Sequence, residues 1–126
     1  DYNRVNLLMA VLEKRCRLPL SRYDAYVNIA GGMRMNEPAV DLAAVIAIIS
    51  SFRDRAVEAD TVIFGEVGLS GEVRAVPLAE YRIREAAKLG FTRCIMPKSN
   101  AEKCKAVENI ACCGVSSIQE AMHLLF

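Results

Sequence analysis

Residues 65–77 read GEVGLSGEVRAVP, and this stretch decides how the surrounding chain is expected to fold. Glycines recur every third residue between two short apolar segments, which is typical of a tight turn between paired strands. We therefore expect a hairpin over residues 61–76. A phosphate-binding loop would require the motif GxxxxGK[ST] between a strand and a helix, and the sequence lacks this motif.

Helices and strands are expected to alternate on both sides of the hairpin. Apolar spacing predicts helices over residues 3–14, 38–53, 78–89 and 116–125. Apolar runs bounded by turn residues predict strands over residues 25–30, 61–66, 93–96 and 109–113. The expected N-terminal caps are Asn36, Ser99 (with Glu102) and Ser116 (with Gln119). The first strand, second helix and second strand would form a right-handed β-α-β unit, so the pattern predicts one α/β domain.

Composition excludes several classes of protein. Hydrophobic residues make up 53% of the 126 residues, which suits a domain with a core and excludes a disordered tail. No apolar run reaches the roughly 18–20 residues of a membrane span, so no membrane partner is expected. The five cysteines include no CxxC pair, so neither a zinc site nor a disulfide framework is predicted, and free thiols suggest the cytoplasm. Cys112 and Cys113 are adjacent, so their side chains would point to opposite faces of a strand. We expect both to fill space in the core.

Basic residues gather in one stretch of the chain. Residues 82–105 hold seven basic and two acidic residues, whereas the net charge of the whole chain is only +1. Such a stretch can contact phosphate groups or form an ordinary solvated face, and both interpretations stay open. The candidate DNA-contacting residues are Arg53, Arg55, Arg82, Arg84, Lys88, Arg93 and Lys98. They would neutralise phosphates without reading bases.

No enzymatic constellation emerges from the residues themselves. The single histidine, His123, lies on the predicted last helix without a nucleophile beside it. Glu66 and Glu72 would face each other across the predicted hairpin, but no cleft is implied, and structural roles are favoured. No metal ligands are predicted.

The hairpin stretch, the helix after it, KLGF at residues 88–91 and MPK at residues 96–98 resemble the proteolytic domain of Lon-type proteases. The segment NEPAVD at residues 36–41 resembles the part that carries their nucleophilic serine. The resemblance implies a Lon proteolytic-domain-like (ribosomal protein S5 domain 2-like) fold. Lon proteases use a serine–lysine dyad. The matching positions hold Ala39 and Glu80, which supply neither nucleophile nor base, so no catalytic residue and no peptidase activity is expected.

A Lon-like domain without its dyad is similar to that of a family of bacterial DNA-repair proteins. Further segments that resemble this family are DYNRV at residues 1–5, AGG at 30–32, SFRDR at 51–55 and REAAKLGF at 84–91. The resemblance implies a longer protein with a four-cysteine zinc motif and a RecA-like ATPase core, which forms hexameric rings and drives branch migration of recombination intermediates. We expect residues 1–126 to be a single Lon-like domain cut from such a chain. ATP, magnesium and zinc would belong to the full-length protein, and this fragment would bind no cofactor.

Three functional hypotheses follow. The first is a ring-forming module that contacts DNA. The second is a purely structural oligomerisation domain, with the first helix or residues 122–126 contacting other subunits. The third is a catalytically dead relic that holds peptides near Ala39 and Glu80 or adds a strand at the hairpin edge.

Overall fold

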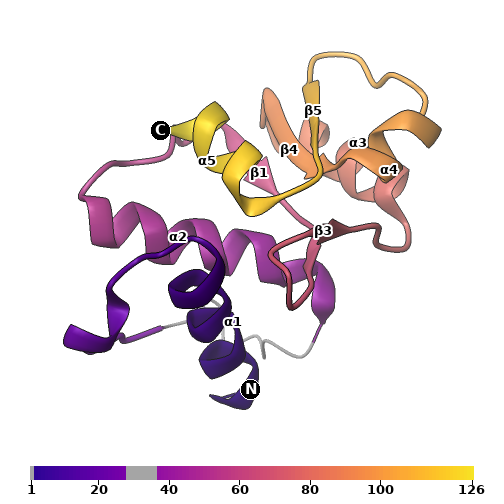
Figure 1. Cartoon of the computed structure of the whole chain (residues 1–126). Coiled ribbons are helices and arrows are strands. Elements are labelled where there is room, and N and C mark those ends of the chain that lie inside the picture. The colour runs from indigo at the N-terminus through magenta and orange to yellow at the C-terminus, as the bar shows by residue number, and fades with distance from the viewer. Residues whose placement is uncertain (1, 28–36) are drawn as a thin grey trace.

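The computed structural model describes residues 2–27 and 37–126 of the chain (Figure 1). Its α-helices are α1 (Tyr2–Arg15), α2 (Asp41–Arg53), α3 (Ala79–Lys88), α4 (Lys98–Lys103) and α5 (Ile118–Leu125). Its strands are β1 (Thr61–Ile63), β2 (Glu66–Val67), β3 (Val73–Arg74), β4 (Arg93–Pro97) and β5 (Ala111–Val115). Short 3-10 turns are η1 (Leu20–Arg22) and η3 (Pro38–Val40).

The described strands form one parallel sheet and one separate hairpin. The sheet has the order β1-β4-β5, with Arg93 of β4 in register with Thr61 on one side and Ala111 on the other. β2 and β3 pair antiparallel, with Val67 opposite Val73. The chain is therefore mixed α/β with parallel strands, as the alternating pattern predicted.

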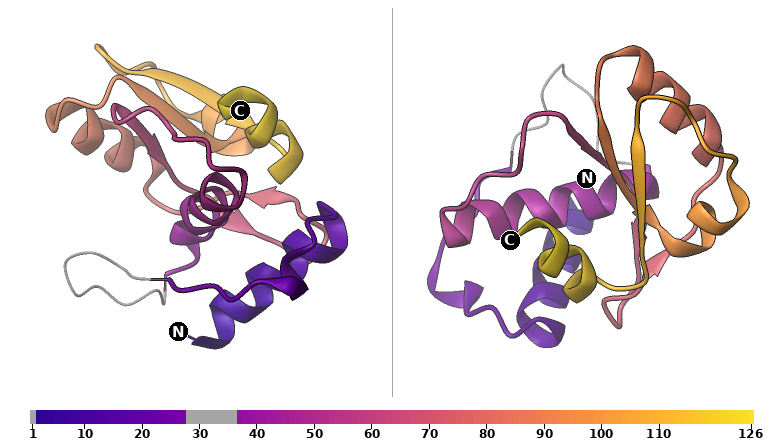
Figure 2. Two further views of the ribbon diagram at one scale, coloured as in Figure 1. Left: turned by 90° about the vertical axis from the view of Figure 1, so that its left-hand side faces the viewer. Right: turned by 90° about the horizontal axis from the view of Figure 1, so that it is seen from above.

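Side chains of the central strand alternate between two apolar layers. Ile95 packs with α1, α2 and α5 in the larger cluster, together with Val115 of β5. Cys94 and Met96 point to the other face, where they pack with Ile83 of α3. This alternation gives a helix–sheet–helix arrangement, with α1 stacked beyond α2 (Figure 2). Within the described part of the chain, no helix combines the length and apolar character needed to cross a membrane.

The hairpin forms as predicted between residues 66 and 74, but it is separated from β1. The predicted strand 61–66 breaks at Gly65, which has a φ of +155°. There the backbone turns to contact α2, because Gly65 N donates to Ala39 O at 2.8 Å and Gly65 O accepts from Leu42 N at 3.0 Å. A Cβ at this position would lie 3.0 Å from Val73 Cγ1. Glycine therefore permits both the turn and the close approach of β3.

The predicted strand 25–30 is wrong for the part that the structure describes. Residues 25–27 form no strand, and residues 28–30 lie outside the described residues, as does the predicted cap Asn36. Tyr23 instead packs edge-on against Phe52 of α2, with ring centroids 5.4 Å apart, and Tyr26 is 91% exposed. The parallel pairs are β1–β4 and β4–β5, so the β-α-β unit expected from the first strand and α2 is not observed in the described residues.

Three predicted boundaries are shifted. The fifth strand covers residues 111–115 instead of 109–113, since Asn109 takes a left-handed φ of 69° that ends the preceding turn. α4 begins at Lys98, so Ser99 lies inside the helix and does not cap it. Ser117, not Ser116, caps α5 by accepting from Glu120 N at 3.1 Å.

Candidate functional site

The two positions that the Lon resemblance assigns to the dyad lie beside one apolar cluster. Ala39, in η3, is buried and packs in the same cluster as Ala79, the residue that precedes Glu80. Glu80 accepts from Lys105 N at 3.1 Å, and its other carboxylate oxygen lies 3.0 Å from Arg84 Nη2. A methyl group and a neutralised carboxylate supply neither a nucleophile nor a base, so this site lacks the dyad chemistry.

An ion pair between the partly exposed Arg4 and the buried Asp41 lies at the N-terminal end of α2, two residues after Ala39. Asp41 has no exposed surface and accepts from Arg4 Nε at 2.9 Å, from Arg4 Nη2, and from Val67 N at 3.0 Å. The hydrogen bond to Asp41 raises the pKa of Arg4 from its ordinary value, against partial desolvation. Glu66 lies 4.0 Å from the same guanidinium. This pair ties α1, α2 and the hairpin together.

The prediction that Glu66 and Glu72 face each other across the hairpin is wrong. The strand register places Glu66 opposite Arg74. Glu72 instead binds Arg74 at 2.9 Å and accepts from Ser70 N at 3.0 Å. Hydrogen bonding to its own backbone N–H and then to Arg74 lowers the pKa of Glu72 from its ordinary value. Glu72 therefore stabilises the hairpin, Glu66 lies beside Arg4 of α1, and the two carboxylates do not form an acid–base pair.

The basic residues of α3 are each paired with a carboxylate. Arg82 binds Glu37 and also donates to Pro77 O at 3.0 Å. Arg84 binds Glu80, and Lys88 lies 3.3 Å from Glu85. These three candidate DNA contacts are therefore partly neutralised by their neighbours.

The remaining candidates lie elsewhere, and the structure does not bring all seven together. Arg93, at the start of β4, donates to Leu124 O at 3.2 Å and so binds the last turn of α5. Lys98 begins α4, on the α3 side of the sheet. Arg53 ends α2, and Arg55 follows in the loop. Among the described residues, neither Arg53 nor Arg55 has a carboxylate partner.

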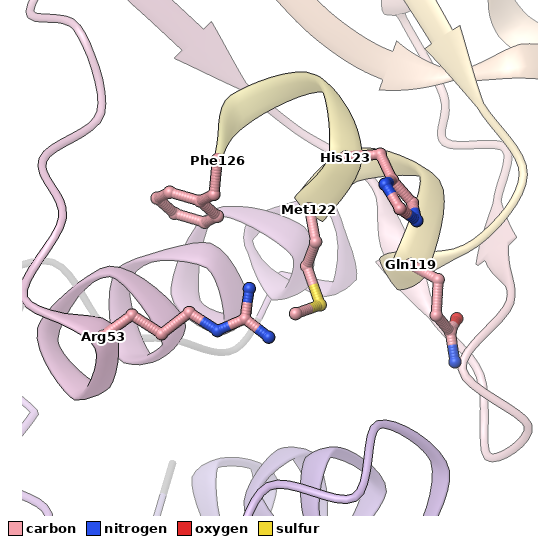
Figure 3. A pocket seen from close by; sticks show the side chains of 5 residues that line it. All are labelled: Arg53, Gln119, Met122, His123 and Phe126. Atoms are coloured by element: carbon pink, nitrogen blue, oxygen red, sulfur yellow. The ribbon is translucent and has the colours of Figure 1, made fainter.

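Arg53 lines a pocket between the C-terminal end of α2 and one side of α5 (Figure 3). The pocket has a volume of about 340 Å³, and its other lining residues are Gln119, Met122, His123 and Phe126. Gln119 Nε2 donates to Arg15 O at 3.1 Å, which orients the amide. Burial raises the pKa of the Cys16 thiol nearby, and the charge of Arg53 partly lowers it, so the guanidinium also lies close to the end of α1.

Sequence reasoning identified Arg53 and noted His123 but did not connect them. It missed Gln119 and Phe126 as neighbours of Arg53, because Gln119 lies 66 positions after Arg53 in the sequence and only the packing of α5 against α2 joins them. The one usable indication was the basic residue at a predicted helix end, which is also explained by the helix dipole.

The cysteines behave differently from one another. Cys94 is buried, and desolvation raises the pKa of its thiol well above the ordinary value. Cys112, its register partner on β5, is exposed, so the expectation of core filler is wrong for it. β5 lies at the edge of the sheet and has a neighbouring strand on one side only, so its side chains are less covered than those of the central strand β4. Among the described residues, no cluster of three or more histidine, cysteine or acidic side chains could hold a metal ion.

Comparison with known proteins gives matches that cover most of the chain. A protein-family model described as subunit ChlI of Mg-chelatase matches residues 3–100. The DNA repair protein RadA of Bacillus subtilis is 52% identical over 123 residues, which are 98% of this chain and 27% of that protein. The protein of the same name from Halalkalibacterium halodurans is 48% identical over 124 residues, with the same coverage of 98% and 27%. That from Synechocystis is 55% identical over 98 residues, 78% of this chain and 19% of the relative.

The chain spans about a fifth to a quarter of the length of these curated relatives. The similarity to a bacterial DNA-repair family that the sequence motifs indicated is confirmed by these matches.

Proposed function

Because this chain belongs to the protein family described as subunit ChlI of Mg-chelatase, and because its relatives are named DNA repair protein RadA, we propose that it acts in DNA repair as a non-peptidase module of a larger RadA-like protein. The module would have a Lon proteolytic-domain-like fold. It would support assembly of that protein and contribute contacts to DNA.

The observation that carries this proposal is the state of the two dyad positions. Ala39 is 3% exposed and packs with Val76 and Ala79, so it cannot present a reactive group to a substrate. Glu80 is held by Arg84 and Lys105 N, so its charge serves local structure. A Lon-like scaffold in this state keeps a fold and loses hydrolysis, which supports a binding or structural role.

DNA contact would come from cationic side chains that neutralise phosphates. Unpaired arginines such as Arg53 and Arg55 suit this role best, because a guanidinium that is already bound to a carboxylate must give up that partner first. In the full-length protein, a DNA-dependent ATPase core would bind ATP and magnesium, a cysteine motif would bind zinc, and subunits would form a hexameric ring.

Fluorescence anisotropy tests the DNA-contact part directly. Labelled single- and double-stranded DNA are titrated with the 126-residue chain at low and at physiological salt. The expected result is binding that weakens steeply as salt rises, because phosphate contacts release counterions. Absence of binding even at low salt would overturn DNA contact as a property of this module. A parallel casein-cleavage assay is expected to show no hydrolysis.

One observation favours a second role in subunit association. A groove of about 820 Å³ runs along α2, lined by Phe52, Ala47 and Tyr23 among others. Two of the lining residues, Tyr23 and Tyr26, are 61% and 91% exposed. Apolar surface of this kind is typical of interaction sites. Sedimentation velocity over a range of concentrations tests it, and a monomer at every concentration would contradict self-association through this groove.

A further inference from the structure

We propose that the pocket between the C-terminal end of α2 and α5 binds a phosphate group of single-stranded DNA. Arg53 would hold the phosphate, and the apolar side of the pocket would contact the adjoining base. This inference rests on the proposed function and deepens it, since it names one contact site and the kind of nucleic acid that the site prefers.

The free guanidinium is the first reason. Arg53 is exposed at the last position of α2 and makes no hydrogen bond or ion pair with any residue in the described ranges 2–27 and 37–126. By contrast, Arg4, Arg74, Arg82 and Arg84 each bind a carboxylate. The planar fork of an unpaired guanidinium matches two phosphate oxygens.

The second reason is the set of polar groups that line the same pocket as Arg53. Gln119 and His123 lie on α5 across from Arg53 and carry N–H groups, and Figure 3 shows their side chains at one side of the pocket. One N–H of Gln119 donates to Arg15 O, which fixes the amide and leaves its second N–H for a ligand. None of the described side chains that line the pocket carries a carboxylate. The acidic residues next in sequence, Asp54 and Glu120, are exposed and do not line the pocket.

The third reason is the apolar side of the pocket, which favours a single strand. Met122 and Phe126 line the same space as Arg53. A volume of about 340 Å³ lies at the lower end of the range for small-ligand sites and suits one nucleotide unit. Unpaired bases can stack on an aromatic ring, whereas paired bases in a duplex are already stacked.

Arg53 could instead serve only the helix, because a cation at a helix C-terminus is stabilised by the dipole. Lysine would serve the dipole equally well but cannot form the two-pronged contact with phosphate. The variant Arg53→Lys therefore separates the two roles.

The test is anisotropy with a labelled oligothymidine and with a duplex of matched length. We expect Arg53→Ala to weaken binding of the single strand about tenfold at physiological salt. The slope of log K against log salt should fall in magnitude by about 0.7, the value for one phosphate contact on a single strand. Arg53→Lys should bind more weakly than the wild type while keeping the same melting temperature. Lys103→Ala is the matched control, since this exposed lysine lies on α4 on the other side of the sheet.

Phe126→Leu keeps apolar packing and removes the ring, so it should weaken the single strand more than the duplex. Wild-type affinity in Arg53→Ala, with DNA binding otherwise intact, would overturn this inference and leave the proposed function standing. Duplex binding that equals single-strand binding and depends equally on Arg53 would overturn the single-strand assignment. Equal competition by thymidine monophosphate and by the oligothymidine, per mole of ligand, would assign the pocket to free nucleotides instead. No DNA binding by any form would overturn both proposals.

Discussion

The arginines at the two ends of α2 differ in whether they are paired with a carboxylate. At the N-terminal end, Arg4 is bound to Asp41, which has no exposed surface and also accepts from the backbone of Val67. At the C-terminal end, Arg53 is exposed and, within the described residues, has no partner. The first arginine is committed to holding α1, α2 and the hairpin together. The second contributes little to the fold and is available to a ligand.

This difference shows why counts of charge along a sequence are a poor guide to binding. Residues 82–105 are the most basic stretch of the chain, yet the three basic candidates on α3 are each paired with an acid. Arg53 belongs to a stretch, residues 36–81, in which acidic residues outnumber basic ones. Local pairing, which depends on tertiary structure, decides which cation can meet a phosphate.

Removal of Asp41 should give the largest loss of stability, because it takes the hydrogen-bonded carboxylate from Arg4 at the N-terminal end of α2 and so makes Arg4 more like Arg53 at the other end. Asp41→Ala takes the hydrogen-bond acceptor away from Val67 N and from the partly exposed Arg4. Hydrogen bonds to a charged group are worth about 1.5–3 kcal/mol each, so we expect the unfolding free energy to fall by about 3 kcal/mol. Chemical denaturation followed by circular dichroism measures this loss. Glu66→Gln is the matched control, because Glu66 touches Arg4 only at 4.0 Å and is partly exposed. Equal losses in the two variants would contradict the central role of Asp41.

Placing a hydroxyl at the position that the Lon resemblance assigns to the nucleophile should have the next largest effect. Ala39→Ser places a polar group in an apolar cluster, at a cost of about 1–3 kcal/mol, and the serine has no lysine to activate it. We therefore expect a lower melting temperature and no cleavage of casein. Ala44→Ser, on the partly exposed face of α2, is the control for the added hydroxyl. Hydrolysis by Ala39→Ser alone would contradict the loss of the dyad.

Much of the fold could be predicted because its signals are local. The helices near residues 3–14 and 78–89 follow from apolar spacing, and the hairpin turn follows from the glycines. The strand at residues 25–30 could not be judged in this way, since alternation does not reveal whether a segment finds a pairing partner. The cap of α5 was misplaced by one residue because Ser116 and Ser117 can both accept from a helix N–H.

Less of the candidate site could be predicted. The positions Ala39 and Glu80 came from family resemblance, and their proximity to one cluster became visible only in the structure. The pocket at Arg53 depends on α5 packing against α2, a contact between distant segments. No sequence pattern marks which arginines remain unpaired.

A smaller effect is expected where the backbone is left-handed. Leu78, at the start of α3, has φ 61° and ψ 31° and is 70% exposed, so its strain is not offset by burial. Leu78→Gly relieves about 1–2 kcal/mol of backbone strain in the folded state. Glycine also raises the entropy of the unfolded chain, which destabilises the folded state by roughly 0.4–1 kcal/mol. We therefore expect the unfolding free energy to rise by about 0.5–1 kcal/mol. Asp54, which ends α2 with φ 53° and ψ 46°, provides the comparison. Aspartate tolerates this conformation, so Asp54→Gly should gain less, and a larger gain there would contradict the strain argument.

The smallest effect is expected on α3 and sharpens the contrast with Arg53. Arg84 is bound to Glu80 one helical turn away, and this exposed pair is worth little to stability. If pairing removes Arg84 from the set of phosphate contacts, Arg84→Ala leaves the salt dependence of DNA binding unchanged, whereas Arg53→Ala reduces it. Anisotropy titrations over a salt series measure both slopes. Arg84→Ala removes a cation and also leaves the Glu80 carboxylate without its salt-bridge partner. The double variant Glu80→Gln/Arg84→Ala removes both charges, so it shows the effect of the lost cation alone. The slope of log K against log salt could instead fall as much in Arg84→Ala as in Arg53→Ala. That result would mean that an arginine exchanges its carboxylate partner for phosphate without penalty. Pairing with a carboxylate would then not distinguish the surface around Arg84 from the surface around Arg53.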